Sequence, residues 1–303
     1  MELKTAELYK SFGEKAVLRG VSFSVTGGRA LGILGRNGAG KTTTIRIIMQ
    51  VFSPDSGEVL LDGQPMTPGK VKIGYLPEER GMYPKKPVMQ QLLYFGMLAG
   101  LKKREAAANA DRLLERLEMT EYRDKRLDTL SKGNQQKIQL VATLIADPDI
   151  IILDEPFSGL DPVNAMLLKD LVRELIAKGR IVLFSSHQMN YIEEFCDDIA
   201  ILNGGKIVLS GDIGEIKRSF DRRTILLSGA DTKKIDAFLT EQAFPFVAAH
   251  EITDGKVAVT LCAPQDKEAL YKALEPLAGI FDAFVVKEPT LNEIFVHYTE
   301  GAI

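Results

Sequence analysis

Several residue types are scarce in this 303-residue chain, and each shortage excludes something. The chain has no tryptophan, and its two cysteines, Cys196 and Cys262, lie far apart in the sequence. Because they show no metal-ligand spacing, we expect no metal site built on cysteine. So few cysteines are typical of a reducing compartment, and the cytoplasm is the simplest interpretation.

Long apolar runs and long basic runs are also missing. No apolar run approaches the ~20 residues that a helix needs to cross a bilayer, and the first residues lack signal-peptide character. The net charge is −3 without a basic block, so nothing predicts a nucleic-acid partner. With 45% hydrophobic and 26% charged residues, the composition is that of an ordinary globular protein. The length suits one large domain and one small one.

A glycine-rich segment, residues 35–42, is the most informative feature that is present; it reads Gly-Arg-Asn-Gly-Ala-Gly-Lys-Thr. Residues 30–34 before it predict a strand and residues 43–49 after it predict a helix, the order that a phosphate-binding loop requires. Glycines let backbone N–H groups turn toward an anion, and the start of the helix adds further N–H groups. Lys41 is then expected to reach the β- and γ-phosphates, and the Thr42 hydroxyl to bind Mg²⁺. A glycine-rich turn in an ordinary α/β domain is the alternative.

A pair of acids follows a second apolar run. Residues 150–153 predict a strand buried on both faces of a parallel sheet, and it runs directly into Asp154 and Glu155. Ligands of open α/β sheets bind at this carboxyl edge, so the acids and the glycine-rich loop are expected to share one crevice. Asp154 would hold Mg²⁺, and Glu155 would orient and deprotonate an attacking water. A solvated acid pair at the end of a strand is the alternative.

Two further segments add polar groups to this picture. Residues 130–137 open a predicted helix with Ser131 as its N-cap, which offers a second phosphate-binding helix start. His187 follows a predicted strand at residues 181–184, where it would come within reach of the γ-phosphate. A surface or packing histidine is the alternative.

Together these segments resemble the nucleotide-binding domain of ATP-binding cassette (ABC) transporters over roughly residues 1 to 220. The matching motifs are the Walker A loop (35–42), the signature (130–136), Walker B (150–154) with Glu155, the D-loop (158–161) and the switch His187. The resemblance implies an ATPase in which two domains pair head to tail and enclose each ATP between one Walker A loop and the partner's signature.

The resemblance also implies which residues contact ATP. On the Walker A side they are Phe12, Gly35, Arg36, Asn37, Gly38, Ala39, Gly40, Lys41, Thr42 and Thr43. The partner's ATP would be contacted by Ser131, Gly133, Asn134 and Asp161. Phe12 would stack on the adenine, and an ordinary core aromatic (Phe12 or Tyr9) is the alternative. Catalysis would rest on Glu155, His187 and Lys41.

Two positions depart from the family pattern. The signature, usually Leu-Ser-Gly-Gly-Gln, has Lys132 and Asn134 at its third and fifth places, but it keeps Ser131 and Gly133. The loop after residues 73–76, which usually carries a glutamine (the Q-loop), has Glu78 instead. A carboxylate there could still bind Mg²⁺, so we expect Thr42, Asp154 and Glu78 as the metal ligands.

The expected fold is an α/β P-loop cassette with a mixed sheet core, an antiparallel β subdomain and a helical subdomain at about residues 85–146. Residues 75–87 would line a groove that receives a coupling helix of the membrane subunit; a plain solvated loop is the alternative. After the cassette, a pattern of β-α-β-β-α-β predicts a ferredoxin-like domain. Its segments are expected at 224–227, 233–242, 246–251, 256–261, 267–277 and 283–286, and a last helix at 291–298 would dock back. The predicted domains are therefore 1–220 and 221–303.

The second domain resembles the C-terminal extension of bacterial sodium-export and drug-resistance ATPases. We therefore predict the ATPase subunit of an ABC exporter for an unidentified solute, working with separate integral membrane permease subunits. It would bind ATP and Mg²⁺, form a homodimer or heterodimer, and lie in the cytoplasm on the inner face of the cell membrane. The alternative is an ABC ATPase module that regulates a membrane or sensor partner without transport.

Overall fold

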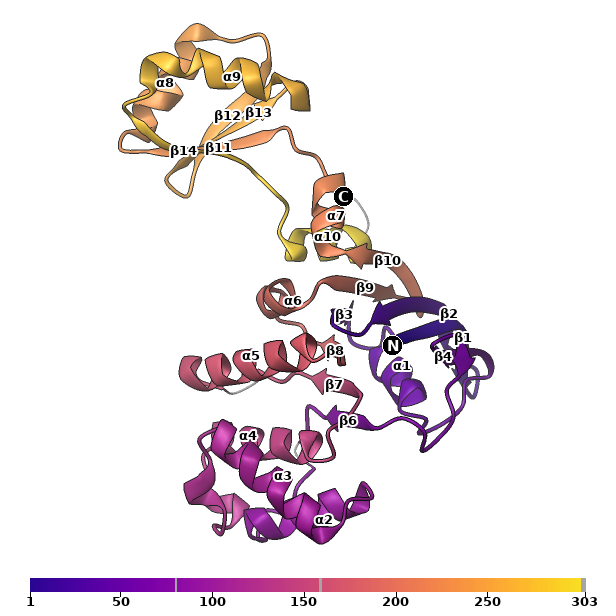
Figure 1. The fold of residues 1–303 in the computed structure, drawn as a ribbon. Helices are drawn as coiled ribbons and strands as arrows, with labels where there is room; N and C mark the ends of the chain where they lie inside the picture. Colours follow the sequence, from indigo (N-terminus) through magenta and orange to yellow (C-terminus); the bar gives the residue numbers. More distant parts are fainter. Residues whose placement is uncertain (80, 158–159, 301–303) are drawn as a thin grey trace. The chain divides into compact units, whose positions relative to one another are not determined.

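A computed structural model describes residues 1–79, 81–157 and 160–300 of the chain. It divides into two compact units, one formed by Met1–Ile213 together with Phe295–Ile303 and one by Gly214–Ile294. We call them the first and the second unit and describe each by itself (Figure 1). The first residues of the last helix thus belong to the second unit, and its final residues to the first.

The first unit is built on a six-stranded mixed sheet. Its strand order is β10(Lys206–Asp212), β9(Asp198–Asn203), β3(Ala30–Gly35), β8(Ile181–Ser185), β7(Ile150–Asp154) and β6(Ile73–Leu76). All neighbours are parallel except the hairpin of β9 and β10. The central strands are buried on both faces, as their continuous apolar sequences predict. Three helices, α1(Lys41–Ile48), α5(Pro162–Ala177) and α6(Met189–Phe195), follow β3, β7 and β8.

An antiparallel sheet completes the core of this unit. Its order is β2(Lys15–Thr26), β1(Glu2–Phe12), β4(Ser56–Leu61) and β5(Gln64–Pro65). Leu8 and Val21 of this sheet pack in one cluster with Ile33 of β3 and Ile45 of α1. The antiparallel subdomain and the mixed sheet confirm the predicted cassette architecture.

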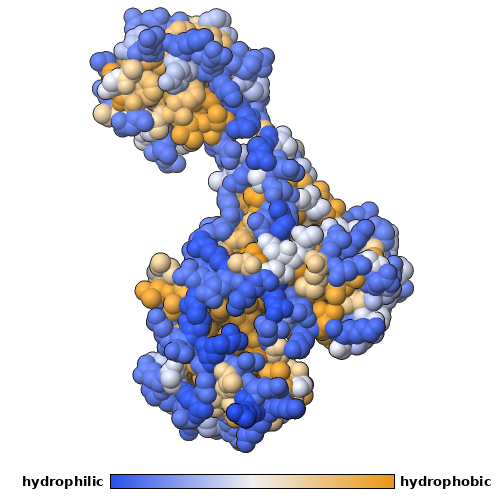
Figure 2. Space-filling view, viewed as in Figure 1, coloured by the Kyte–Doolittle hydropathy of each residue, from blue (hydrophilic) through white to orange (hydrophobic). Residues whose placement is uncertain are grey.

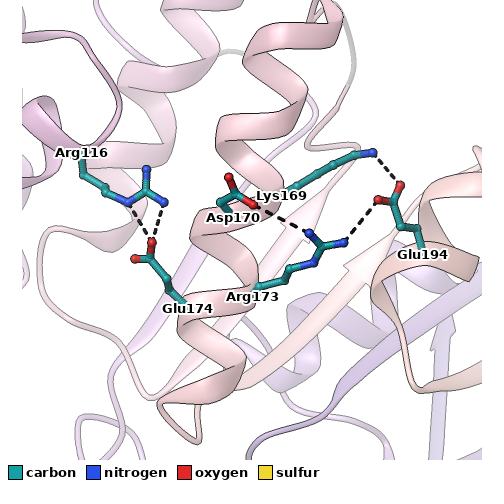
Figure 3. Close-up of polar contacts among 6 residues, drawn as sticks. All are labelled: Arg116, Lys169, Asp170, Arg173, Glu174 and Glu194. Carbon is teal, nitrogen blue, oxygen red and sulfur yellow. Dashed lines mark hydrogen bonds and ion pairs between the residues drawn. The ribbon is translucent and has the colours of Figure 1, made fainter.

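Helices between β6 and β7 form the helical subdomain. They are α2(Val88–Leu98), α3(Lys103–Arg116) and α4(Lys132–Leu144), with short 3₁₀ turns at Thr120–Tyr122 and Leu127–Thr129. Gly96 of α2 lies so close to α3 that a Cβ there would be 2.7 Å from the Cβ of Ala106. Ion pairs connect α3, α5 and α6: Arg116 pairs with Glu174, and Lys169 and Arg173 both reach Glu194 (Figure 3).

The second unit is a four-stranded antiparallel sheet with two helices on one face. The strand order is β12(Val247–Thr253), β13(Lys256–Leu261), β11(Thr224–Gly229) and β14(Phe281–Val286). Helices α8(Thr232–Gln242) and α9(Lys267–Ala273) contribute Leu239 and Leu270 to a core with Ile225 and Val259. The β-α-β-β-α-β order confirms the predicted ferredoxin-like arrangement.

The helices at the ends of the second unit are α7(Ile213–Ser219) and α10(Leu291–Glu300). The helix predicted at 267–277 is shorter: α9 ends at Ala273, and a 3₁₀ turn, Glu275–Leu277, follows. Pro276 explains this, because proline supplies no N–H for a continuing helix. The end of α10 contacts the rest of the first unit, where Glu300 pairs with Arg36 at 2.5 Å.

The surface seen in Figure 2 is mainly hydrophilic, with separate apolar patches on both units. In the part of the chain that the structure describes, no helix has the length and apolarity needed to cross a membrane.

Burial of β7 between β6 and β8 generates a stability prediction. Ile152→Ala is expected to lower the free energy of unfolding by about 2–5 kcal/mol, because Ile152 is fully buried and the change leaves a cavity. Urea unfolding followed by circular dichroism measures this. Val51→Ala is the control, since Val51 is 61% exposed and its loss is expected to change little. Equal effects of the two substitutions would contradict the assigned packing.

Candidate functional site

The parallel strands bring the predicted site residues to one edge. In the sheet, β8 lies between β3 and β7, and all three run in the same direction. Their carboxyl ends therefore deliver the glycine-rich loop, His187 and the acid pair side by side. Ile33 of β3 and Ser185 of β8 lie opposite each other although they are far apart in the sequence. The order of the strands in the sheet, and not their order in the chain, therefore determines which residues are neighbours.

Backbone geometry shapes the glycine-rich loop. Gly38 and Gly40 have φ values of +83° and +113°, a region that favours glycine. At Gly40 there is also no room for a side chain, since a Cβ would lie 2.6 Å from Leu18 Cδ2. The loop leads into α1, whose first residues include Lys41 and the exposed Thr42.

The ammonium group of Lys41 lies against the loop itself. Its Nζ donates to the carbonyl oxygens of Gly35 at 2.5 Å and of Arg36 at 3.3 Å. Burial lowers the pKa of Lys41, whereas the charges of Asp154, Glu155 and Glu78 act to raise it. Three carboxylates near one ammonium would repel a polyphosphate on their own, so the arrangement suits a polyphosphate that binds together with a divalent cation.

Glu155 and His187 are in direct contact. One carboxylate oxygen of Glu155, Oε1, lies 2.7 Å from both the backbone nitrogen and the Nδ1 of His187, and Oε2 accepts the Ser186 hydroxyl at 2.9 Å. Glu155 is 7% exposed and has a φ of +49°, in the left-handed region that is strained for a non-glycine residue. The carboxylate is thus held in one orientation, with the imidazole beside it 77% exposed. Such a pair can orient a water and accept its proton.

Asp154 has a partner that the sequence did not predict. The Tyr75 hydroxyl lies 3.3 Å from Asp154 Oδ2, and burial, followed by the nearby Asp154 charge, raises the pKa of Tyr75 to about 12. Burial raises the pKa of Asp154, while hydrogen bonds from Ser185 and Tyr75 lower it. Tyr75 lies on β6, which pairs with β7 in the sheet, and no pattern in the sequence indicates this contact.

The donors near the loop fit Mg²⁺. Thr42 and Asp154 offer a hydroxyl and a carboxylate, and hard oxygen ligands are what Mg²⁺ prefers. Among the described residues, no cluster of three or more His, Cys, Asp or Glu could hold a metal by itself. Glu78 follows β6, is exposed, and acts through its charge on both Lys41 and Tyr75.

The residues predicted to contact a partner's ATP begin two helices. Ser131 is the N-cap of α4, and its Oγ accepts the backbone N–H of Asn134 at 3.3 Å. Gly133 is buried, whereas Ser131 is exposed. Asp161 caps α5 by accepting the backbone N–H of Asn164 at 3.0 Å, which lowers the pKa of Asp161. The other D-loop residues predicted, Ser158 and Gly159, lie outside the described residues.

Phe12 lies at the end of β1 and is 50% exposed. Its ring meets Phe52 edge to face at 5.6 Å, and the Lys10 ammonium lies 5.7 Å from its centre. Half of its surface is therefore accessible, as stacking on a base requires.

A groove lies beside α2 and α4. It has a volume of about 380 Å³ and is lined by residues that include Pro77, Met82, Phe95, Leu98 and Gln139. Leu98 is 72% exposed, and Tyr83 and Tyr94 nearby in the sequence are 54% and 47% exposed. The predicted groove segment 75–87 contributes several of these residues, and Arg80 within it lies outside the described residues.

Two family models match the chain. Residues 18–158 match the family described as ABC transporter, and residues 211–299 match the family described as ATP-binding protein DrrA1-3-like, C-terminal domain. The two matches cover the cassette core and the C-terminal region respectively.

Relatives are similar over nearly the whole chain. The ABC transporter ATP-binding protein YhaQ of Bacillus subtilis is 40% identical over 95% of this chain and 95% of its own length. The Nod factor export ATP-binding protein I of Rhizobium meliloti is 31% identical over 98% of this chain and 88% of its own length. The linearmycin resistance ATP-binding protein LnrL of Bacillus subtilis is 29% identical over 98% of both.

A solved structure has the same fold. The structure of an ATP-binding subunit of an ABC transporter superposes with a TM-score of 0.67 and 30% identity, over 79% of this chain and all of its own.

The contact between Glu155 and His187 generates a prediction. Glu155→Gln removes the base but keeps a side chain of the same shape, so nucleotide binding is expected to persist while hydrolysis falls about 10²–10⁴-fold. Phosphate release measures the rate, and light scattering with ATP and Mg²⁺ is expected to detect a persistent dimer. Glu58→Gln, an exposed acid on β4, is the control with unchanged hydrolysis. A fully active Glu155→Gln protein would refute the role of this carboxylate.

Proposed function

This chain belongs to the ABC transporter ATP-binding proteins, and on that premise we propose how its residues divide the work. It is an ATP-binding and ATP-hydrolysing subunit of a transporter. The meeting of Lys41, Asp154 and the Glu155–His187 pair at one sheet edge is the observation that carries the assignment of roles. Phosphoryl transfer depends mainly on positioning and charge neutralisation, and these groups supply both.

In our proposal, Lys41 and the amides of residues 35–43 neutralise the phosphates, and Phe12 stacks on the adenine. Glu155 polarises the attacking water, and His187 holds the γ-phosphate. The geometry around Glu155 supports this, because its carboxylate is already oriented by Ser186 and His187.

Magnesium is proposed to be held by Thr42, Asp154 and Glu78. When bound, it would neutralise charge on the phosphate oxygens. Burial raises the pKa of Asp154 overall, whereas the Ser185 and Tyr75 hydroxyls act to lower it. A bound cation would act in the same direction as these hydroxyls, because it favours the ionised carboxylate.

The proposed working form is a dimer with a second ABC domain, either a second copy or a close relative. In it, Ser131, Gly133, Asn134 and Asp161 would contact the ATP held by the partner's Walker A loop. The observation that favours this arrangement is a second helix start suited to an anion: α4 begins at Ser131, while the start of α1 is already proposed to serve one nucleotide.

We further propose that the subunit works on the inner face of the cell membrane and powers export through permease subunits. The export and resistance named for relatives support the direction. The groove near Pro77 and Leu98, with its exposed apolar side chains, supports docking of a membrane subunit's helix. We found no specific observation favouring a regulatory module without transport.

The proposed functional division is a cassette at 1–220 and an accessory domain at 221–303. The second unit has its own core, which supports a separate role in structure or dimer stability. In this unit the Nδ1 of His250 on β12 lies 2.7 Å from Asp236 Oδ1 on α8, and among its described residues no group of three or more His, Cys, Asp or Glu could hold a metal ion.

Removal of the Lys41 ammonium tests the nucleotide site. Lys41→Ala is expected to abolish measurable ATP binding, because the Lys41 ammonium is the cation held against the Gly35 carbonyl, whereas Arg36 of the same loop is 62% exposed and pairs with Glu300. Isothermal titration calorimetry measures the affinity, and Lys206→Ala on β10 is the charge-matched control. Undiminished affinity in Lys41→Ala would remove the phosphate-loop assignment.

Purification from detergent-solubilised membranes tests the partner. The tagged chain is expected to bring down an integral membrane protein with several spans, identified by mass spectrometry. Leu98→Glu, which places a charge at the 72% exposed groove position, is expected to reduce the recovery. Recovery of the chain without any membrane protein, in repeated purifications, would count against the transporter role.

A further inference from the structure

The main chain around Glu78 is held from the side by a buried amide. Gln139 of α4 is 5% exposed, and its Nε2 lies 3.3 Å from the carbonyl oxygen of Pro77 and 3.3 Å from that of Glu79. These two carbonyls flank Glu78 on either side. An amide has two N–H groups, so one side chain serves both acceptors.

A second residue of the same helix holds the preceding strand. Thr143 lies one turn after Gln139, on the same helix face. Its hydroxyl lies 3.2 Å from the carbonyl oxygen of Tyr75 and 3.0 Å from that of Gln139, so it bridges the helix and the strand. The Tyr75 phenol lies 3.3 Å from Asp154. Helix α4 therefore contacts the main chain at Tyr75, which precedes Glu78, and on both sides of Glu78 itself.

We propose that Gln139 and Thr143 form a clamp that positions the two carboxylates on the metal side of the nucleotide site. Gln139 fixes the peptide groups around Glu78, and Thr143 fixes β6 at Tyr75, which in turn orients Asp154. Both are positioning residues, because they act through other groups. The inference rests on the proposed roles of Glu78 and Asp154 as metal ligands.

Glu78 needs such support more than the other site residues do. Asp154 and Lys41 lie within a strand and a helix, whereas Glu78 follows the end of β6 and has an exposed side chain. A segment without a hydrogen-bonding ladder stays in one conformation only when its carbonyls find partners elsewhere. The buried position of Gln139 supplies them at a fixed place.

The clamp also connects two half-sites within one chain. Helix α4 begins at Ser131, which is proposed to contact the partner's ATP, and it carries Gln139 and Thr143 further along. A helix is a stiff element, so a shift of its first turn moves the clamp as well. Contact of the signature with the partner's ATP would thereby change the positions of the proposed metal ligands in the same chain.

Manganese affinity tests the clamp directly. The full chain is loaded with a non-hydrolysable ATP analogue, and free Mn²⁺ is measured by electron paramagnetic resonance. Gln139→Leu and Thr143→Val, each similar in size to the original, are expected to weaken Mn²⁺ binding about fivefold, the effect expected from the loss of one ordinary hydrogen bond. Gln50→Leu is the matched control, because Gln50 also donates its amide to a main-chain carbonyl, that of Met66, away from the site.

Two further variants distinguish a failure of the clamp from a failure of the metal-ligand role proposed for Glu78. Glu78→Ala is expected to weaken Mn²⁺ binding at least as much, and adding Gln139→Leu to it is expected to cause little further loss. If Glu78→Ala binds Mn²⁺ as the unaltered protein does, Glu78 is not a ligand and positioning through Gln139 is overturned. Positioning of Asp154 through Thr143 and Tyr75 is then decided by Thr143→Val, and ATP binding by Lys41 stands on its own test.

If Glu78→Ala weakens binding but Gln139→Leu and Thr143→Val do not, the clamp alone is overturned. Thermal unfolding is recorded for each variant, and Thr143→Val carries the test if Gln139→Leu is unfolded. Full additivity of Glu78→Ala and Gln139→Leu would likewise contradict positioning through Glu78.

Discussion

The parallel pairing of β3, β8 and β7 is the constraint on which the site depends. Each strand is buried on both faces, so none can shift its register without exposing or clashing apolar side chains. Because the three strands share one direction, their polar ends must emerge at the same edge. The Glu155–His187 contact at 2.7 Å is a consequence, since Glu155 directly follows β7 and His187 lies two residues after the end of the neighbouring β8.

This edge concentrates charges of both signs in a small space. The Lys41 ammonium is close enough to Asp154, Glu155 and Glu78 for all three to affect its pKa. The loop carbonyls of Gly35 and Arg36 hold that ammonium, although they are weaker partners than phosphate oxygens. A phosphate chain with a divalent cation would balance both the cation and the acids, which explains why the fold keeps a lysine and three carboxylates together.

The last turn of α10 contacts the same glycine-rich loop. The final residues of α10 belong to the first unit, where Glu300 pairs with Arg36 and the Asn203 amide lies 3.3 Å from the Tyr298 carbonyl. An exposed ion pair of this kind contributes little stability. The pair connects Arg36 of the glycine-rich loop with the last turn of α10, a helix whose first residues belong to the second unit.

The nucleotide motifs could be predicted from the sequence because each depends on residues that lie close together along the chain. A glycine loop, a capped helix start and an acid pair after an apolar run each have a short-range pattern, so the fold class and the ATPase family followed from them. The helix predicted at 267–277 ends at Ala273 instead, because Pro276 interrupts a segment whose apolar pattern favours a longer helix.

Other features depended on side chains that meet only after folding. No pattern in the sequence connects Tyr75 with Asp154, or Gln139 with the carbonyls beside Glu78, because these contacts join β6 to β7 and to α4. The sequence by itself determined which groups would bind phosphate and where strands and helices would form. Only the tertiary structure decided which of these groups touch and what holds them, since strand order and helix packing bring together residues that are distant along the chain.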